Sequence, residues 1–388
     1  SKGYCIKGIG INLFDTGLVL TNYICDSNLQ PVPMNMKTSI IRFFLTCMLA
    51  SHWCTPQVWS QEEASSDQTT SSSQTRRPSI GEVVRLDERI NQLIPQDAAI
   101  ELLAEGFEWA EGPVWDRKSK AILFSDIPNN VVNKWNESEG LSVFLKPSGY
   151  TGKNPRLGEM GSNGLTFDSS GKLVLAMHGD RQIGRLNSKG QIDTVVQFYK
   201  YRRFNSPNDL VYDSKGNLYF TDPPYGLEKN MDDPAKELLF QGVYLLRRNG
   251  DLVLLTDKMT RPNGIDLSPD GKTLYVANSD PEQAHWLAFD VLDDGTVANE
   301  RGFFDATSMV GAANPGLPDG LKVDVHGAVW ATGPGGVLVL TPKGEHIGTI
   351  RPGPATANCG FGNDGSTLYL TSDMYLCRIQ TSTSGQGF

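Results

Sequence analysis

The stretch Arg203–Asp222, RFNSPNDLVYDSKGNLYFTD, contains the pattern that decides the fold. Asn208 and Asp209 precede a short apolar run, the turn DSKG follows, and a second β-rich run ends at Asp222. Turn chemistry alone accounts for one such phrase. Related phrases, however, begin at five further positions: Glu111 (EGPVWDRKSKAILFSD), Asn163 (NGLTFDSSGKLVLAM), Asn263 (NGIDLSPDGKTLYVAN), Asp319 (DGLKVDVHGAVWATG) and Cys359 (CGFGNDGSTLYLTS).

The six phrases follow one another at intervals of 40 to 56 residues. Repeats of this length with several strands each are typical of a β-propeller. The sequence therefore predicts an all-β fold, a six-bladed β-propeller, whereas a β-sandwich would not require six matched hairpins. Residues 98–103 predict the outer strand of the last blade, which would close the ring. The segment RLDERINQLI, residues 85–94, predicts a short N-terminal helix.

The first 80 residues differ in composition from the repeats. Residues 34–60 begin with Met and Lys, continue as a short apolar segment and end near Ser60, which predicts a signal peptide and a secreted or periplasmic protein. Residues 1–33 are then an upstream extension, although the whole region could instead be an unusual N-terminal extension. Residues 61–80 are rich in Ser and Thr and predict a disordered linker. Residues 81–388 form the predicted propeller domain.

Composition limits the partners. The formal net charge is -9, which argues against a nucleic-acid partner. Because the chain has no apolar run of about 18 residues, we expect no membrane span. Cys359 and Cys377 are the only cysteines after the linker, and the sequence leaves open whether they form a disulfide or remain free thiols. It also leaves the oligomeric state open.

The residues that begin the six inner strands predict a cation site. In a propeller the first strand of each blade lines the central channel, so Glu111, Asn163, Asn208, Asn263, Asp319 and Cys359 should converge on the axis. All of these except Cys359 carry a side-chain oxygen. Carboxylate and amide oxygens favour a hard divalent cation, Ca²⁺ or Mg²⁺, over zinc. A cation also gives a physical reason for burying converging acids.

The ends of the second strands should lie on the same face, because the second strand runs antiparallel to the first. The side chains expected around this rim are His178, Asp180, Arg181, Asp222, Tyr225, Asn278 and Asp280. Arg181 and Tyr225 are candidates for binding substrate hydroxyl groups. His178 could bind substrate, act as a base or serve only as a structural residue. Asn163 could contact substrate or only close its turn.

The phrases EGPVW, SPNDLVYD, RPNG and PDGL resemble those of the gluconolactonase/regucalcin family, with HGDRQI and TDPPYG similar to its bacterial gluconolactonase branch. The resemblance covers about residues 82–379 and implies a six-bladed propeller that hydrolyses sugar lactones and other esters. It implies metal ligands at Glu111, Asn208, Asn263 and Asp319, and an acid/base role for Asp319. Cys359 departs from the oxygen pattern, so blade six is not expected to bind the metal.

The chemistry of the residues agrees with this implication. A lactone carbonyl bound to a divalent cation would be polarised, and Asp319 could accept a proton from the attacking water, with Asp209 as the alternative base. Ca²⁺ is the expected cation, with Mg²⁺, Mn²⁺ or Zn²⁺ as alternatives, and D-glucono-1,5-lactone is the expected substrate. Two rival functions stay open: another lactonase or a phosphotriesterase on the same site, or a non-enzymatic binding scaffold with a structural ion.

Overall fold

The computed structural model describes residues 12–14, 17–19 and 77–388. The first two segments are strands β1 (Asn12–Phe14) and β2 (Gly17–Val19), which pair antiparallel. The predicted signal peptide and nearly all of the predicted linker lie outside the described residues and stay predictions. The last residues of that linker are described, however, and Ile80 N–H donates to the Ile100 carbonyl, so pairing with the propeller begins before residue 81.

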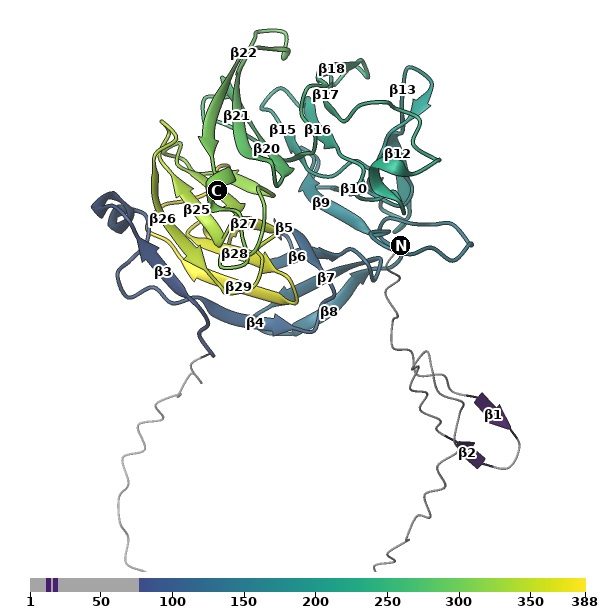
Figure 1. Cartoon of the computed structure of the whole chain (residues 1–388), viewed down its shortest axis with the longest axis horizontal. Helices are drawn as coiled ribbons and strands as arrows, with labels where there is room; N and C mark the ends of the chain where they lie inside the picture. Colours follow the sequence, from purple (N-terminus) through teal and green to yellow (C-terminus); the bar gives the residue numbers. More distant parts are fainter. Residues whose placement is uncertain (1–11, 15–16, 20–76) are drawn as a thin grey trace, which may run out of the picture. The chain divides into compact units, whose positions relative to one another are not determined.

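The rest of the described chain is a six-bladed β-propeller, as the repeats predict (Figure 1). Within each blade the strands pair antiparallel in chain order. Blade 1 contains β5 (Ala110–Asp116), β6 (Ala121–Asp126), β7 (Val131–Asn136) and β8 (Gly140–Leu145). Blade 2 contains β9 (Ser162–Phe167), β10 (Leu173–Met177), β11 (Gln182–Leu186) and β12 (Ile192–Val196). Blade 3 contains β15 (Leu210–Tyr212), β16 (Leu218–Asp222), β17 (Gly242–Leu246) and β18 (Leu252–Thr256).

The remaining blades follow in the same way. Blade 4 contains β19 (Pro262–Leu267), β20 (Thr273–Asp280), β21 (Gln283–Val291) and β22 (Val297–Asp305). Blade 5 contains β23 (Leu321–Val323), β24 (Val329–Gly333), β25 (Gly336–Leu340) and β26 (His346–Arg351). Blade 6 contains β27 (Asn358–Gly362), β28 (Thr367–Ser372) and β29 (Tyr375–Gln380). A short hairpin of β13 (Phe198–Tyr199) and β14 (Arg202–Arg203) lies between blades 2 and 3 in the chain.

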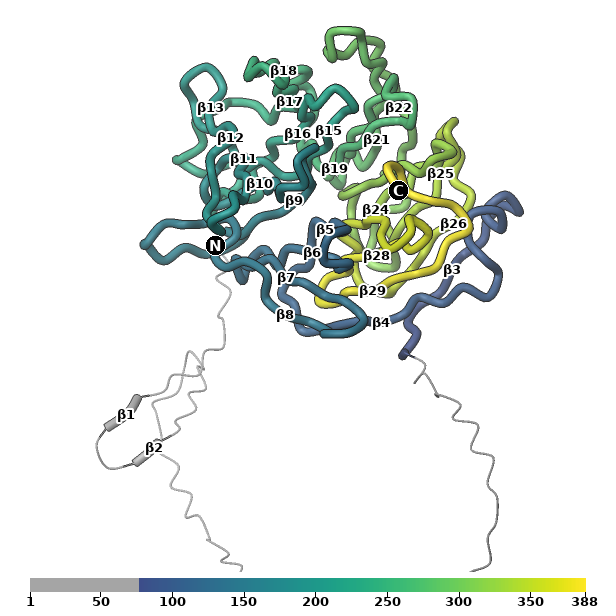
Figure 2. Tube along the Cα trace, turned by 180° about the vertical axis from the view of Figure 1, so that it is seen from behind, coloured from purple at the N-terminus to yellow at the C-terminus, as the bar shows by residue number. Residues whose placement is uncertain are grey.

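The N-terminal part of the domain closes the ring. Strand β4 (Glu101–Glu105) pairs with β29 as the outer strand of blade 6, which confirms the prediction for residues 98–103 (Figure 2). Strand β3 (Glu82–Arg85) pairs with β26 as a fifth strand of blade 5, which the sequence did not predict. The expected helix of residues 85–94 is a 3-10 helix, η1 (Glu88–Gln92), packed against β26. Two further 3-10 helices are η2 (Asn230–Asp232) and η3 (Thr307–Met309).

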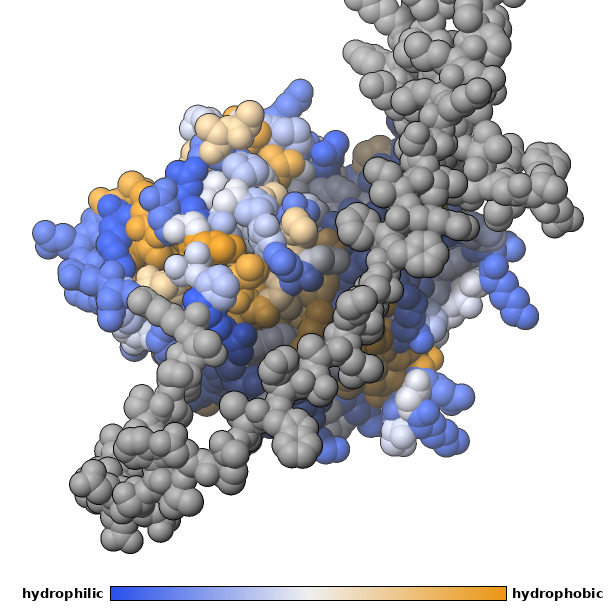
Figure 3. All heavy atoms as spheres, turned by 90° about the horizontal axis from the view of Figure 1, so that it is seen from below, coloured by the Kyte–Doolittle hydropathy of each residue, from blue (hydrophilic) through white to orange (hydrophobic). Residues whose placement is uncertain are grey.

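The hydrophobic core consists of clusters between neighbouring blades. Each of the six blade junctions has its own cluster of buried side chains, such as Phe220 and Tyr244 between blades 2 and 3, and Trp286 and Trp330 at the junctions of blade 5. Burial of this apolar area is the main force that holds the blades together. The outer strands are more exposed, and the outer edge of the ring shows hydrophobic side chains among hydrophilic ones (Figure 3).

Cys359 and Cys377 are free buried thiols rather than a disulfide. The Sγ of Cys359 donates to the Trp330 carbonyl, 3.3 Å away, and Cys377 packs in the cluster between blades 5 and 6. Within the part of the chain that the structure describes, no helix is long and apolar enough to cross a membrane.

Candidate active site

The six inner strands contact one another in sequence around the axis, from β5 to β9, β15, β19, β23, β27 and back to β5. Their starts face a cavity of about 510 Å³. Five of the six predicted axial residues line this cavity, namely Glu111, Asn163, Asn208, Asn263 and Asp319. Cys359 does not line it. The register of the repeats therefore placed the five oxygen-bearing residues correctly.

Hydrogen bonds between neighbouring blades fix the backbone of these residues. Ser125 Oγ, at the end of β6, donates to the Asn163 carbonyl at 2.8 Å, and Thr221 Oγ1, at the end of β16, donates to the Asn263 carbonyl at 2.7 Å. The hydroxyl groups at the ends of second strands thus hold the first strand of the next blade. The glycine after Asn263 permits the close approach of blade 5, because a Cβ on Gly264 would lie 2.2 Å from the Asp319 carbonyl oxygen.

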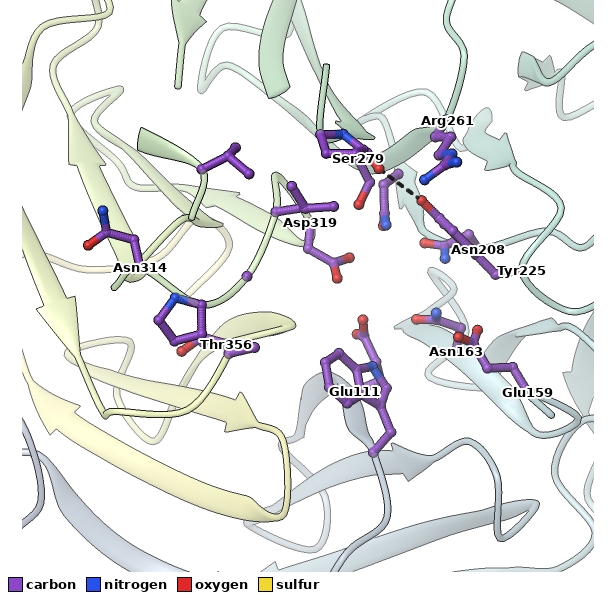
Figure 4. Close-up of a pocket in the computed structure, with 18 of the residues that line it drawn as sticks. Glu111, Glu159, Asn163, Asn208, Tyr225, Arg261, Ser279, Asn314, Asp319 and Thr356 are labelled. Atoms are coloured by element: carbon purple, nitrogen blue, oxygen red, sulfur yellow. Dashed lines mark hydrogen bonds between the residues drawn. The ribbon is translucent and has the colours of Figure 1, made fainter. Parts of the chain in front are cut away.

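β-Bulges aim the side chains inward. The register between β5 and β6 shifts after Glu111, and the register between β19 and β20 shifts between Pro262 and Ile265, on either side of Asn263. Such shifts bend a strand and turn its side chains, and they are common next to active sites. Figure 4 shows the carboxylates of Glu111 and Asp319 pointing toward one another across the cavity, with Asn163 and Asn208 beside them.

Glu111 is buried, and Asp319 is half-buried with its Oδ1 atom buried. Within the described part of the chain neither forms a salt bridge. Burial raises the pKa of Glu111 to about 8. Burial also raises the pKa of Asp319 well above its usual range, and the neighbouring charges of Glu111 and Glu159 add to the increase. Without a compensating cation, the two carboxyl groups therefore favour their protonated forms.

Asn358, at the start of β27, holds Glu111. Its Nδ2 donates to Glu111 Oε2 at 3.0 Å, and the Gly112 N–H donates to the same oxygen at 2.7 Å. Blade 6 thus contributes a residue that orients an acid of the cavity. The repeat pattern does not predict this role, because Cys359, one residue later, occupies the aligned position.

Several oxygen atoms at the cavity have no hydrogen-bond donor. Asn163 Oδ1, Asn208 Oδ1 and Asp319 Oδ1 are buried without a partner among the described residues. An unpaired buried acceptor costs about 1–3 kcal/mol, so three of them at one cavity indicate a missing electron-poor ligand. A second cavity is lined by Trp115 and Tyr369 among other residues. Within the described chain, none of its lining residues has a buried polar side-chain atom without a hydrogen-bond partner.

This donor set fits a hard divalent cation. The described residues contain no group of three or more His, Cys, Asp and Glu side chains that could hold a metal. The cavity instead offers two carboxylates together with amide oxygens, which Ca²⁺ and Mg²⁺ accept as ligands and which zinc does not favour. Glu111, Asn208, Asn263 and Asp319 would hold the ion, and the unpartnered Oδ1 of Asn163 makes this residue a further donor.

The predicted rim residues lie in different places. Tyr225 lines the cavity, and its hydroxyl donates to the Ser279 carbonyl at 3.3 Å (Figure 4). Arg181 does not line the cavity: its Nε and Nη1 donate to the carbonyls of Phe204 and Ala235, so it anchors the loop before β17. His178 is fully buried behind the cavity wall.

Most of the other strand-end residues anchor loops as well. Asp180 accepts hydrogen bonds from Thr151, Asp222 accepts from the backbone of Asn205 and Ser206, and Asn278 accepts from the Arg261 N–H. Side chains on neighbouring positions of a strand point to opposite faces, and the sequence does not show which of them reaches the cavity. Of the predicted rim side chains, only Tyr225 lines the described cavity. Asn163, the other substrate candidate that lines it, belongs to the first-strand residues around the axis.

Asp209 also lies outside the cavity lining. Its carboxylate accepts from its own strand at Leu210 N–H (2.9 Å) and from Ile265 N–H (3.4 Å), and it lies near the half-buried Lys322. Asp209 therefore joins blades 3 and 4 below the cavity. This geometry gives no support to Asp209 as the alternative base.

The chain matches the family model described as the SMP-30/Gluconolactonase/LRE-like region over residues 109–374. The chain belongs to this family. The matched residues of this family member include all five axial residues that line the cavity. The resemblance inferred from the sequence is thus confirmed.

Two curated relatives and one solved structure illustrate the similarity. The chain is 38% identical to a gluconolactonase of Zymomonas mobilis over 314 residues, which covers 79% of this chain and 88% of the relative. It is 28% identical to regucalcin of Xenopus laevis, over 70% of this chain and 85% of the relative. A solved gluconolactonase from Xanthomonas campestris is 29% identical, with a TM-score of 0.65, and covers 79% of this chain and 99% of that structure.

The cavity geometry predicts that cation binding depends on pH. A glutamic acid in an unfolded chain has a pKa near 4.5, whereas burial raises that of Glu111 to about 8. The raised pKa stabilises the cation-free fold below pH 4.5, and this stabilisation is lost as the pH rises through 8. A cation requires ionised carboxylates, so protonation of Glu111 alone should lower the apparent affinity about tenfold for each pH unit below 8.

Thermal unfolding with excess Ca²⁺ and with chelator, between pH 5 and pH 9, measures this effect. The difference between the two melting temperatures should increase with pH, and Glu111→Gln should reduce that dependence. A cation-induced difference that is the same at pH 5 and pH 9 would contradict the linkage.

Proposed function

We propose that this family member hydrolyses lactones of polyhydroxylated acids, with D-glucono-1,5-lactone as the representative substrate and a divalent cation, most simply Ca²⁺, as cofactor. The observation that carries the proposal is the convergence of two carboxylates, buried Glu111 and half-buried Asp319, with unpartnered amide oxygens at one cavity. The 38% identity to a gluconolactonase over most of both chains supports the substrate class. The cavity volume of about 510 Å³ lies within the range of small-molecule sites.

When bound, the cation supplies Lewis-acid polarisation of the lactone carbonyl and stabilisation of negative charge on its oxygen. The residues of the chain supply the rest of the chemistry. Asp319 has one buried oxygen without a hydrogen-bond partner, and a carboxylate in this position can accept a proton from the attacking water. Glu111, held by Asn358 and Gly112, keeps a fixed orientation on the opposite side of the cavity.

The walls of the cavity suit a small polar ring. Trp109, Pro281 and Leu317 provide apolar surface, which excludes water around the reacting ester. Tyr225 and Ser279 offer polar groups for substrate hydroxyls. Arg261 also lines the cavity, and its guanidinium group can attract the carboxylate of the opened product.

Proton release during hydrolysis of D-glucono-1,5-lactone tests the proposal. The purified protein is assayed after chelation and again after addition of Ca²⁺, Mg²⁺, Mn²⁺ or Zn²⁺ in turn. We expect chelation to abolish turnover above the spontaneous rate and at least one ion to restore it. Turnover that persists in the chelated protein would contradict cation dependence. Failure with every ion on a panel of lactones and esters would favour the binding scaffold.

The variant Asp319→Asn tests the proposed base. It removes the proton acceptor but keeps the size of the side chain, so kcat/KM should fall by about 10²- to 10⁴-fold. Asp270→Asn, in an exposed turn of blade 4, is the matched control and should keep wild-type turnover. Circular dichroism verifies that both variants are folded. Full activity of folded Asp319→Asn would exclude Asp319 as the base.

A further inference from the structure

The loop between β8 and β9 brings a third carboxylate to the cavity. Glu159 lines the cavity beside Asn163, and its side chain is 35% exposed (Figure 4). Among the described residues it forms no salt bridge with an arginine or lysine. Glu159 lines the same cavity as Glu111 and Asp319, and its charge adds to the effect of burial in raising the pKa values of both.

A buried histidine lies directly behind this carboxylate. His178 is 0% exposed, and its Nδ1 lies 3.2 Å from Glu159 Oε2, although the alignment is too poor for a hydrogen bond. Within the described chain, neither ring nitrogen has a hydrogen-bond partner. A lone pair on Nδ1 would repel the carboxylate, so the proximity of Glu159 favours the tautomer that carries the proton on Nδ1. A purely structural histidine at this depth would be expected to have its polar atoms satisfied.

His178 is fixed between two loops that carry cavity residues. The backbone N–H of His178 donates to the Gly161 carbonyl at 3.1 Å, in the loop that carries Glu159. On the other side, a Cβ on Gly226 would lie 2.5 Å from the His178 Cβ, so the backbone next to Tyr225 presses against the histidine. His178 can therefore set the position of the Glu159 carboxylate relative to Tyr225.

The carboxylate of Glu159 has a chemistry that the proposed reaction step does not use. An ionised carboxylate accepts hydrogen bonds through two oxygens, and neighbouring hydroxyl groups of a sugar ring are suitable donors. Among the described residues no lysine or arginine pairs with Glu159, so its charge would repel a phosphate group placed beside it. This part of the cavity thus favours neutral, hydroxylated groups.

We propose that Glu159 binds the hydroxyl groups of the lactone and that His178 is the positioning residue that holds it in place. This inference rests on the proposed lactonase function and specifies its substrate class: neutral lactones that carry hydroxyl groups. The ester carbonyl does not contact Glu159, so a lactone without hydroxyl groups should not depend on it.

The first test compares two substrates of Glu159→Gln. D-glucono-1,5-lactone has hydroxyl groups on its ring, whereas δ-valerolactone has the same ring size and none. We expect KM for the gluconolactone to rise roughly 10- to 100-fold, as for the loss of hydrogen bonds to a charged group, and KM for δ-valerolactone to change less than about twofold. Glu228→Gln, on an exposed position of a neighbouring loop, is the matched control and should change neither value.

The second test concerns His178. His178→Asn retains a donor near the position of Nδ1 and should keep KM close to wild type, whereas His178→Phe should raise KM for the gluconolactone selectively. Glu159→Gln combined with His178→Phe should be no worse than Glu159→Gln alone, because both changes disrupt one interaction. If His178→Phe does not fold, the asparagine variant and Glu159→Gln still decide the question.

The outcomes separate this inference from the proposed function. If the wild type hydrolyses both lactones and Glu159→Gln changes both KM values equally, or neither, then Glu159 does not bind hydroxyl groups and the lactonase function stands. If the wild type hydrolyses neither lactone with any cation, the function and the inference are both overturned.

Discussion

The central physical constraint in this molecule is the presence of two carboxylates, of buried Glu111 and half-buried Asp319, that face one cavity. Low-dielectric surroundings disfavour a buried charge, and two like charges near one another disfavour it further. The arrangement is stable as a charged pair only if a cation binds between them. The amide oxygens of Asn163 and Asn208 beside the acids have no hydrogen-bond partner, and a bound cation would satisfy them as well. The site, the expected cofactor and its pH dependence all follow from this constraint.

The propeller can hold two acids at one cavity because it fixes the backbone of each residue that is expected to bind the cation. Each inner strand packs between two others around the axis, and Ser125 and Thr221 hold the neighbouring blade by hydrogen bonds to its carbonyls. A site built on rigid strands keeps its ligands in place better than one built on loops. The loops are left to supply residues such as Glu159 and Tyr225, where differences in substrate choice can arise without change to the ring.

The sequence predicted the ring of the site because the repeat supplies a register. Five axial residues and the closing strand β4 follow from aligned phrases, since equivalent positions of equivalent blades must converge. Strand β3 and Glu159 could not be found in this way, because neither belongs to the repeat. Asn358 was missed because it precedes the aligned position by one residue. In blade 6 the residue that reaches toward the cavity is not the one that begins the phrase.

The assignments that the structure does not support have a common cause. Arg181 and Asp209 were placed near the cavity by their strands, but their side chains instead hydrogen-bond to the backbone of nearby loops and strands. A polar residue at the end of a strand can satisfy the backbone of a loop or face the ligand. The choice depends on the local twist and on bulges, which a single sequence does not specify.

A crystal structure of the protein with Mn²⁺, in which the anomalous signal locates the ion, tests the cation site directly. We expect one strong peak in the central cavity, within coordination distance of side-chain oxygens of Glu111, Asn263 and Asp319 and of at least one of Asn163 and Asn208. Absence of a peak there at saturating Mn²⁺, with the carboxyl groups ionised at pH 8.5 to 9, or a strong peak only elsewhere on the protein, would contradict it.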